Sequence, residues 1–303
     1  MTWTPDDVPD LDGKTFVVTG GNSGIGLEAA RIFVRRGARV VLACRSAERA
    51  MPAVTLLSSV RPGTQVSFLA LNLADLSSVR SFSERIHAEV DYIDVLVNNA
   101  GVMRLPRTET VDGFEMQLAT NHLGHFALTG LLLDLLQAAP APRVVTVASL
   151  AHRRGVLNFD DLMGAKHYDK FGAYCQSKLA NLLFHYELGR RASLLNVACH
   201  PGYTATKLVT ANARLSGSVV GQGFWALVNR FVAQEAGSGS HTTVYAATMP
   251  DVRRGDYYGP AGMMEMWGAP TRVQSTEAAR DEDAARRLWD VTTELTGVPY
   301  SFS

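Results

Sequence analysis

A tyrosine and a lysine stand four residues apart, at Tyr174 and Lys178, in a stretch with the composition of a helix. Residues at i and i+4 share one helix face, so we expect the phenol and the ammonium to project toward the same place. A free tyrosine titrates near pH ~10, and a nearby cation lowers its pKa by favouring the phenolate. The pair could therefore give a proton to a nascent alkoxide or take one from an alcohol.

Tyrosine and lysine at this spacing are also common in helices that do no chemistry, so a third group must support the interpretation. Ser149 follows the apolar run Arg143–Val147, which we expect to be a strand. A serine there can cap a helix or turn, and its hydroxyl can equally bind a substrate oxygen. Ligands bind beyond the carboxyl ends of parallel strands. We therefore expect Ser149, Tyr174 and Lys178 to act together.

A glycine-rich segment runs from residue 19 to 26, between an expected strand at 14–19 and an expected helix that ends at 36. Glycines there permit a tight turn and close approach of the backbone to a pyrophosphate. The helix N-terminus adds free N–H groups and a favourable dipole for an anion. The strand before the loop and the helix after it favour a nucleotide site over a plain turn. The expected cofactor contacts are Gly20, Asn22, Ser23, Gly24, Ile25 and Gly26.

The end of the expected second strand, 39–43, lacks the carboxylate that an NAD enzyme of this architecture uses to bind the ribose 2′-hydroxyl. Cys44 and Arg45 follow it instead. A guanidinium suits a 2′-phosphate through charge-assisted, bidentate hydrogen bonds. We therefore expect NADP(H) in preference to NAD(H). The alternative is a surface arginine that opens the next helix.

Strand-like and helix-like segments alternate along the chain. These elements must bring the candidate catalytic and cofactor-binding residues together. The strands are expected at 14–19, 39–43, 66–71, 93–97, 143–147, 196–200 and 257–260, and the helices at 24–36, 47–60, 77–90, 110–138, 172–194, 237–248 and 277–295. The strand segments are continuous apolar runs, which is typical of parallel strands buried on both faces. The fold class is therefore α/β: one doubly wound Rossmann domain over 1–303, with a parallel sheet of about seven strands flanked by helices.

The glycine spacing, followed by Ser149, Tyr174 and Lys178 in that order, resembles the short-chain dehydrogenase/reductase family over roughly residues 12–250. The resemblance implies that these three residues are catalytic and that Lys178 also binds the nicotinamide ribose. Asn121 matches the helix-kink asparagine of the family. Its main chain is there implied to hold a water that connects Lys178 to solvent.

The resemblance implies further cofactor contacts around the nucleotide. They are Asn72 and Leu73 beside the adenine, Asn99, Ala100 and Gly101 beside the adenine ribose, and Pro201, Gly202 and Thr204 beside the nicotinamide carboxamide. Many relatives have aspartate at the position of Asn72. Asn98, the first residue of the Asn-Asn-Ala-Gly motif, is expected to tie neighbouring strands together.

The strings at 43–46 and 121–126, with 257–260 and 267–268 in the tail, resemble the retinol dehydrogenase and protochlorophyllide reductase-like branch of that family. This resemblance implies a small hydrophobic carbonyl or alcohol substrate. We expect segment 203–235 to cover it. Within that segment, Phe224, Trp225, Leu227 and Phe231 form either an apolar wall of the site or ordinary core. Two other functions stay open: a C=C reductase in which Tyr174 protonates carbon, and a non-catalytic NADP-sensing binding protein.

Composition excludes several other classes of function. The chain has 29 Lys plus Arg and 29 Asp plus Glu, with no basic patch, so we expect no nucleic-acid partner. His122 and His125 lack a third ligand, and Cys44, Cys175 and Cys199 match no metal-binding spacing, so we expect no metal.

The same sequence bears on location and assembly. The odd cysteine count favours a reducing, cytoplasmic compartment. Residues 1–13 lack the basic start and apolar core of a signal peptide, and no run reaches the ~18 apolar residues of a membrane span. The family resemblance implies a possible homo-oligomer that pairs through the helices expected at 110–138 and 172–194.

Overall fold

One mixed sheet organises the part of the chain that the computed structural model describes, residues 2–203 and 236–302. Its strands are β1 Thr15–Thr19, β2 Arg39–Cys44, β3 Val66–Ala70, β4 Val95–Asn98, β5 Arg143–Val147, β6 Leu195–Cys199, β7 Tyr257–Pro260 and β8 Pro270–Arg272. Their order is β3-β2-β1-β4-β5-β6-β7-β8. Neighbouring strands from β3 to β7 are parallel, which confirms the expected doubly wound α/β fold, and β8 adds an unexpected antiparallel edge strand.

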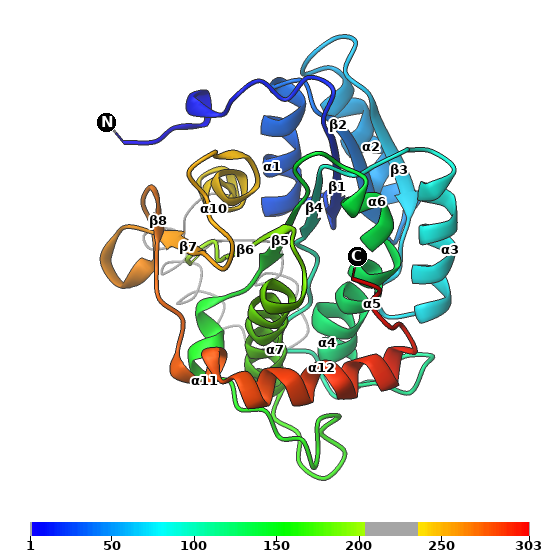
Figure 1. The fold of residues 1–303 in the computed structure, drawn as a ribbon, viewed down its shortest axis with the longest axis vertical. Coiled ribbons are helices and arrows are strands. Elements are labelled where there is room, and N and C mark those ends of the chain that lie inside the picture. Colours follow the sequence, from blue (N-terminus) through cyan, green and yellow to red (C-terminus); the bar gives the residue numbers. More distant parts are fainter. Residues whose placement is uncertain (1, 204–235, 303) are drawn as a thin grey trace, which may run out of the picture.

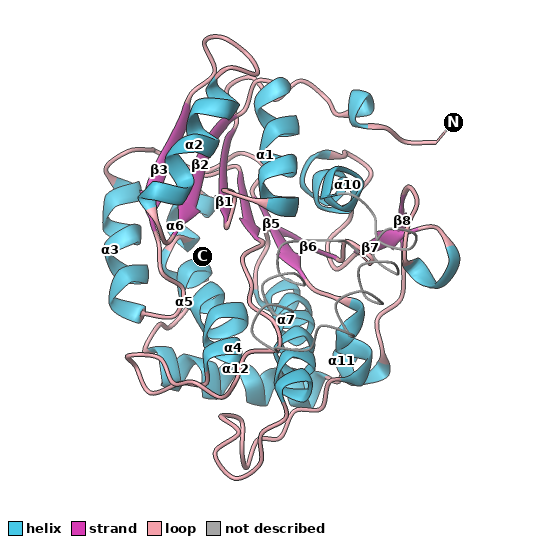
Figure 2. Ribbon diagram, turned by 180° about the vertical axis from the view of Figure 1, so that it is seen from behind, coloured by secondary structure: helices cyan, strands magenta, loops and turns pink. Residues whose placement is uncertain are grey.

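Helices cover both faces of the sheet (Figures 1 and 2). They are α1 Gly24–Arg35, α2 Ala47–Ser58, α3 Leu76–His87, α4 Met116–Leu118, α5 Gly124–Leu131, α6 Leu133–Gln137, α7 Lys170–Arg191, α10 Ala236–Thr248, α11 Glu277–Arg280 and α12 Glu282–Thr296. Val18 and Leu42 point to the core under α1, α2 and α10. Their neighbours Val17 and Val41 point to the core under α3, α5 and α7. Since both faces are buried, the strands read as continuous apolar runs.

Over 110–138 we expected one long helix or two joined ones, and the structure has three joined pieces that begin later. It starts at Met116, because Glu115 caps α4 by accepting hydrogen bonds from the N–H groups of Gln117 and Leu118 at 2.9 and 2.7 Å. A π-helical segment, Ala119–Leu123, joins α4 to α5. A second interruption at Leu132 separates α5 from α6. Glutamate is an unusual cap, so this start could not be predicted from the residue type.

The helix expected over 277–295 is divided as well, into α11 and α12. Asp281 separates the two and caps α12, accepting from Ala284 N at 2.9 Å. The other short helical turns of the described chain are 3-10 helices at Pro5–Asp7, Leu150–Arg154 and Met263–Glu265.

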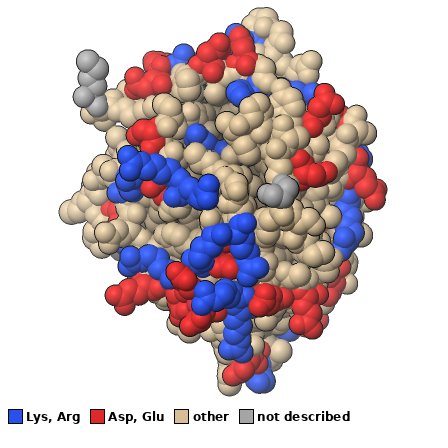
Figure 3. Space-filling view, viewed as in Figure 1, with Lys and Arg blue, Asp and Glu red and all other residues tan. Residues whose placement is uncertain are grey.

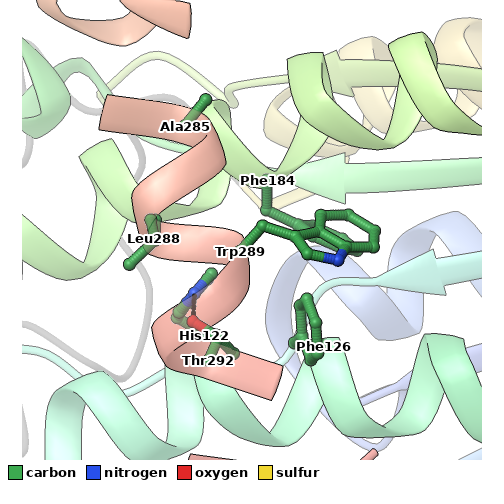
Figure 4. Close-up of a pocket in the computed structure, with 7 residues that line it drawn as sticks. All are labelled: His122, Phe126, Phe184, Ala285, Leu288, Trp289 and Thr292. Carbon is green, nitrogen blue, oxygen red and sulfur yellow. Dashed lines mark hydrogen bonds between the residues drawn. The ribbon is translucent and has the colours of Figure 1, made fainter. Parts of the chain in front are cut away.

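The C-terminal helix α12 packs across α7 and α5. Trp289 of α12 stacks on Phe184 of α7, with ring centroids 5.8 Å apart, and meets Phe126 of α5 edge-on at 5.0 Å (Figure 4). Every side chain of α7 from 175 to 185 is buried. This chain's own α12 therefore packs on part of the helices that we expected to pair with a second chain.

Charge on the surface is mixed. Figure 3 shows acidic groups lying among the basic ones on the face that it presents. The basic pair at the end of α7 is partly neutralised, because Glu187 accepts from Arg190 at 2.8 Å and from Arg191 at 2.6 Å. Among residues 2–203 and 236–302, no helix has both the length and the apolar character needed to cross a membrane.

Candidate active site

Most of the expected catalytic and cofactor-binding residues lie at the edge of the sheet where the parallel strands end. One predicted residue follows each of six strands: Gly20 after β1, Arg45 after β2, Asn72 after β3, Asn99 after β4, Ser149 after β5 and Pro201 after β6. The strand order reverses between β1 and β4, and in open α/β sheets ligands bind in the crevice at such a point.

The loop between β1 and α1 forms a cradle in which Gly20 and Gly26 stand where a side chain would be strained or would clash. Gly20 has φ +66°, and a Cβ on Gly26 would lie 2.5 Å from Asn99 Nδ2 and 2.8 Å from the Gly20 carbonyl oxygen. Ser23 stands at the N-cap of α1, but its side chain makes no capping hydrogen bond. The first N–H groups of a 12-residue helix thus lack the usual side-chain cap. This arrangement fits a pyrophosphate, for which helix N-termini are favourable sites.

The end of β2 lies against this cradle. Burial raises the pKa of the Cys44 thiol to about 11, while hydrogen bonds from the backbone of Asn22, Gly21 and Gly20 oppose the rise. Cys44 therefore touches the glycine loop. The next residue, Arg45, is exposed and precedes α2, whose N-cap Ser46 accepts from Arg49 N at 3.3 Å. A cation thus occupies the place beside the cradle where NAD enzymes carry a carboxylate.

The side chains of Ser149 and Tyr174 lie close enough for a hydrogen-bonding interaction that lowers the pKa of Tyr174. Ser149 also caps the 3-10 helix Leu150–Arg154 by accepting from Ala151 N at 3.2 Å. The residue can therefore serve both as a helix cap and as a contact for the substrate oxygen. Burial raises the pKa of Tyr174, and the interaction with Ser149 lowers it by less. We expected a lowered pKa for Tyr174, and the net shift in the protein alone is upward, because burial outweighs the lowering influence of Ser149.

Lys178 is buried beside the tyrosine on the same face of α7. Its Nζ lies 5.9 Å from the centroid of the Tyr174 ring and donates a hydrogen bond to the carbonyl of Val147 at 3.0 Å. Burial lowers the pKa of Lys178 to about 8. Phenol, hydroxyl and ammonium therefore converge at the end of β5.

Asn121 stands inside the π-helical segment, buried, with its amide directed at the site. Its Oδ1 accepts from Val102 N at 2.8 Å, and its Nδ2 donates to Val102 O at 2.9 Å and to Ser177 Oγ at 2.8 Å. A Cβ on Gly101 would lie 3.2 Å from Asn121 Oδ1 and 3.6 Å from Lys178 Nζ. Gly101 thus allows the Asn121 amide and Lys178 to lie close to the backbone that follows β4.

The two asparagines at the end of β4 make other contacts than those that we expected. Asn98 Nδ2 donates to Thr129 Oγ1 of α5 at 2.9 Å, so Asn98 ties strand to helix and not strand to strand. Asn99 joins the strands instead, donating from Nδ2 to the Thr19 carbonyl at 2.8 Å. Thr19 Oγ1 also accepts from Asn99 N and Ala100 N, each at 2.9 Å. Sequence reasoning missed Thr19, whose only signal was its place before Gly20.

The expected adenine contacts lie beyond β3. Asn72 is half-buried, and its Oδ1 accepts from Ala74 N at 3.4 Å. Leu73 is buried in the core, and its carbonyl lies against the Cα of Gly124, where a side chain would clash. Leu73 can therefore offer a nucleotide its backbone and not its side chain.

The expected nicotinamide turn follows β6. Gly202 has φ +72°, and a Cβ there would clash with the carbonyl of Met266, which also accepts from Tyr203 N at 3.0 Å. The loop at 261–268 therefore packs directly against Gly202 and Tyr203. Thr204, Phe224, Trp225, Leu227, Phe231 and the rest of segment 204–235 lie outside the described residues.

The two histidines of the π-helical region are engaged with hydroxyl groups. His122 Nε2 pairs with Thr292 Oγ1 at 3.1 Å and His125 Nε2 with Thr19 Oγ1 at 2.9 Å. Within the described ranges, no group of three or more His, Cys, Asp or Glu side chains could hold a metal ion.

Comparisons with known proteins agree with this geometry. The sequence profile of the short chain dehydrogenase family matches residues 14–215. Retinol dehydrogenase 13 of Homo sapiens is 40% identical over 296 residues, covering 95% of this chain and 86% of that protein. A crystal structure of an uncharacterized protein from Mycobacterium paratuberculosis has a TM-score of 0.82 and 39% identity over all of both chains.

A more distant solved structure shares the fold. A Shigella flexneri short chain dehydrogenase complexed with NADP has a TM-score of 0.62 and 22% identity, covering 81% of this chain and 95% of that one. The profile and the relatives at about 40% identity cover most of this chain. The chain therefore belongs to the short-chain dehydrogenase/reductase family, in its retinol dehydrogenase-like branch.

Proposed function

We propose that this oxidoreductase transfers a hydride between NADP(H) and the carbonyl or alcohol group of a small hydrophobic substrate. The observation that carries the proposal is the convergence of Tyr174, Ser149 and Lys178 at the end of β5, beside the glycine cradle after β1. The bound nicotinamide would supply or accept the hydride. The residues of the chain would bind the substrate oxygen and move its proton.

Tyr174 is the proposed acid and base. Its pKa is raised by burial, so the phenol keeps its proton at neutral pH and can donate it to an oxygen that gains negative charge. Ser149, whose side chain lies beside the phenol, is placed to share that oxygen. Lys178 holds a positive charge 5.9 Å from the ring centroid, which favours the phenolate left after donation. Asn121 supports this group through Ser177 and Val102.

The proposed cofactor contacts follow the carboxyl edge. On the adenosine side, segment 20–26 would hold the pyrophosphate and Arg45 would hold the 2′-phosphate. The adenine would lie beside Asn72 and Leu73, and its ribose beside Asn99, Ala100 and Gly101. On the nicotinamide side, the carboxamide would be held by Pro201, Gly202 and Thr204, and the ribose by Lys178. Exposed Arg45 at the end of β2, with no carboxylate there, is the reason for preferring NADP(H). The NADP in the Shigella flexneri relative is consistent with that preference.

Substrate class, location and assembly complete the proposal. The relatives named retinol dehydrogenases favour a hydrophobic alcohol or carbonyl compound, covered by segment 203–235 of a single domain. Three buried, unpaired cysteines favour a cytoplasmic location. Because α12 packs on part of α5 and α7, a homo-oligomer would use the surfaces that α12 leaves open.

A panel of apolar aldehydes, ketones, alcohols and activated alkenes, each with NADPH or NADP⁺ and with NADH or NAD⁺, tests this proposal. Turnover is followed at the nicotinamide absorbance. We expect carbonyl reduction or alcohol oxidation, faster with the phosphorylated nucleotide. Turnover of alkenes alone would indicate a C=C reductase, and binding of NADPH without any turnover would indicate a sensing protein.

A further inference from the structure

One buried imidazole joins the two halves of the proposed site. His125 lies on α5 with 3% of its surface exposed. Its Nδ1 lies 3.0 Å from the carbonyl oxygen of Asn121, and its Nε2 lies 2.9 Å from Thr19 Oγ1. Thr19 ends the strand that enters the glycine cradle, and Asn121 stands in the π-helical segment beside Lys178.

The direction of each hydrogen bond follows from the chemistry of the partners. A carbonyl oxygen can only accept, so Nδ1 must carry the proton and donate to Asn121. Burial lowers the pKa of His125 to about 4, with nearby Lys178 lowering it and the Asn121 carbonyl raising it. His122, which faces it from the same region, is also neutral at pH 7 because burial lowers its pKa to about 3. The imidazole is therefore neutral, and Nε2 must accept.

The hydroxyl of Thr19 completes the chain of bonds. Since Nε2 accepts, Thr19 donates its one proton to it. The two lone pairs of Thr19 Oγ1 then accept from Asn99 N and Ala100 N. The Asn99 N–H is shared with the carbonyl of Val97 at 3.0 Å, and the Thr19 proton is directed away from that carbonyl, its alternative acceptor at 3.2 Å.

The two ends of this chain of bonds hold different parts of the site. On one side, Thr19 fixes the backbone of Asn99 and Ala100, where the adenine ribose is proposed to lie. On the other side, the Asn121 amide donates to Ser177 Oγ, and Ser177 in turn donates to the carbonyl of Tyr174 at 2.8 Å.

We propose that His125 is a positioning residue that couples the nucleotide-binding edge to the proton-transfer group through its bonds to Thr19 and Asn121. This role rests on the proposed function. A histidine in the core could instead serve packing alone. His122 supplies the comparison, since it lies in the same helical region and is equally buried, but its Nε2 bonds Thr292 of α12 and not Thr19 (Figure 4).

Replacing His125 by asparagine or by glutamine tests its bonds to Thr19 and to Asn121 separately. An asparagine amide reaches the place of Nδ1 and a glutamine amide the place of Nε2. His125→Asn thus loses the bond to Thr19, and we expect it to raise the Kd of NADPH about fivefold, as loss of one buried hydrogen bond would. His125→Gln loses the bond to Asn121, and we expect kcat to fall at least about tenfold while the Kd of NADPH changes less than about twofold, since small displacements at a reacting centre slow turnover strongly.

The matched controls are His122→Asn and His122→Gln, measured for thermal stability, Kd and kcat. We expect them to leave the Kd of NADPH and kcat within about twofold of the unsubstituted protein. The role of His125 is contradicted if both His125 variants also stay within that range. It is likewise contradicted if the His122 variants lower kcat and NADPH affinity as much as the His125 variants do.

Nitrogen NMR of the imidazole rings in the unsubstituted protein tests the bonding without turnover. We expect His125 to be protonated on Nδ1 and not on Nε2 at pH 7, in the absence of any nucleotide. Protonation on Nε2 would overturn the assignment. These results and the NADPH affinities stand even if the substrate panel finds no turnover, which would count against the proposed function and not against the bonding of His125.

Discussion

Lys178 Nζ donates a hydrogen bond to the carbonyl of Val147 at 3.0 Å, which ties the helix that carries Tyr174 to the strand that leads to Ser149. The bond crosses from α7 to the last residue of β5, two residues before Ser149. Lys178 therefore fixes the spacing between the two hydroxyl groups of the site, besides placing a charge near the phenol. Its burial has a cost in stability, which can be measured.

Replacing Lys178 by methionine should stabilise the protein near neutral pH. The pKa of Lys178 falls from an ordinary 10.5 to about 8 on folding, so the unfolded chain binds more protons between those values and stability rises with pH across them. Below pH 8 the buried charge costs up to about 3 kcal/mol, which Lys178→Met removes. The Val147 carbonyl keeps a second donor, Asn181 Nδ2 at 3.4 Å.

Thermal unfolding at pH 7 and pH 10 measures this effect. The melting temperature of Lys178→Met should exceed that of the unsubstituted protein at pH 7, and the gap should narrow at pH 10. Lys170→Met, at the exposed start of the same helix, serves as the control and should show no such dependence. A gap that is equal at both pH values would contradict the lowered pKa.

Replacing Arg45 by aspartate should change the choice of nucleotide. A guanidinium bound to a 2′-phosphate makes charge-assisted hydrogen bonds, so Arg45→Asp should raise the Kd of NADPH by about 30-fold or more and that of NADH by about threefold or less. Titration of both nucleotides checks this. Arg85→Asp makes the same change of charge in the last turn of α3, and should leave both affinities unaltered. An equal loss of NADPH and NADH binding would remove the argument for NADP(H).

Removing the indole of Trp289 should destabilise the protein without altering the site. Trp289 is 6% exposed between Phe126 and Phe184, so Trp289→Ala should lower the free energy of unfolding by about 3–5 kcal/mol. Trp267 is 39% exposed, and Trp267→Ala should cost about 1 kcal/mol or less. Urea unfolding of both variants makes the comparison. Similar losses in the two would mean that α12 contributes little to the core.

The parallel strands and the edge that carries the site could be predicted from the sequence because both depend on local pattern. Strand β5 occupies the expected residues 143–147, and α10 begins within one residue of its expected start. Strand β8 could not be predicted in this way. It has three residues, Pro270–Arg272, lies at an edge and buries little, so it leaves no apolar run.

Contacts between residues far apart in the sequence could not be predicted either. The set of Ser149, Tyr174 and Lys178 follows from motif order, but the bond between Thr19 and His125 joins residues 106 positions apart. No periodicity encodes such a pair. The direction of the Tyr174 pKa likewise depends on how deeply the folded chain buries the phenol, which spacing along a helix does not reveal.

The central claim is that Tyr174 transfers the proton, and turnover by Tyr174→Phe tests it most directly. Tyr186→Phe is the control, since Tyr186 lies on the same helix and pairs with Ser275 Oγ at 2.8 Å, away from the site. We expect Tyr174→Phe to lower kcat by about 10²–10⁴-fold while binding NADPH normally, and Tyr186→Phe to stay within about twofold. Turnover by Tyr174→Phe at the rate of the unsubstituted protein would contradict the proposed chemistry.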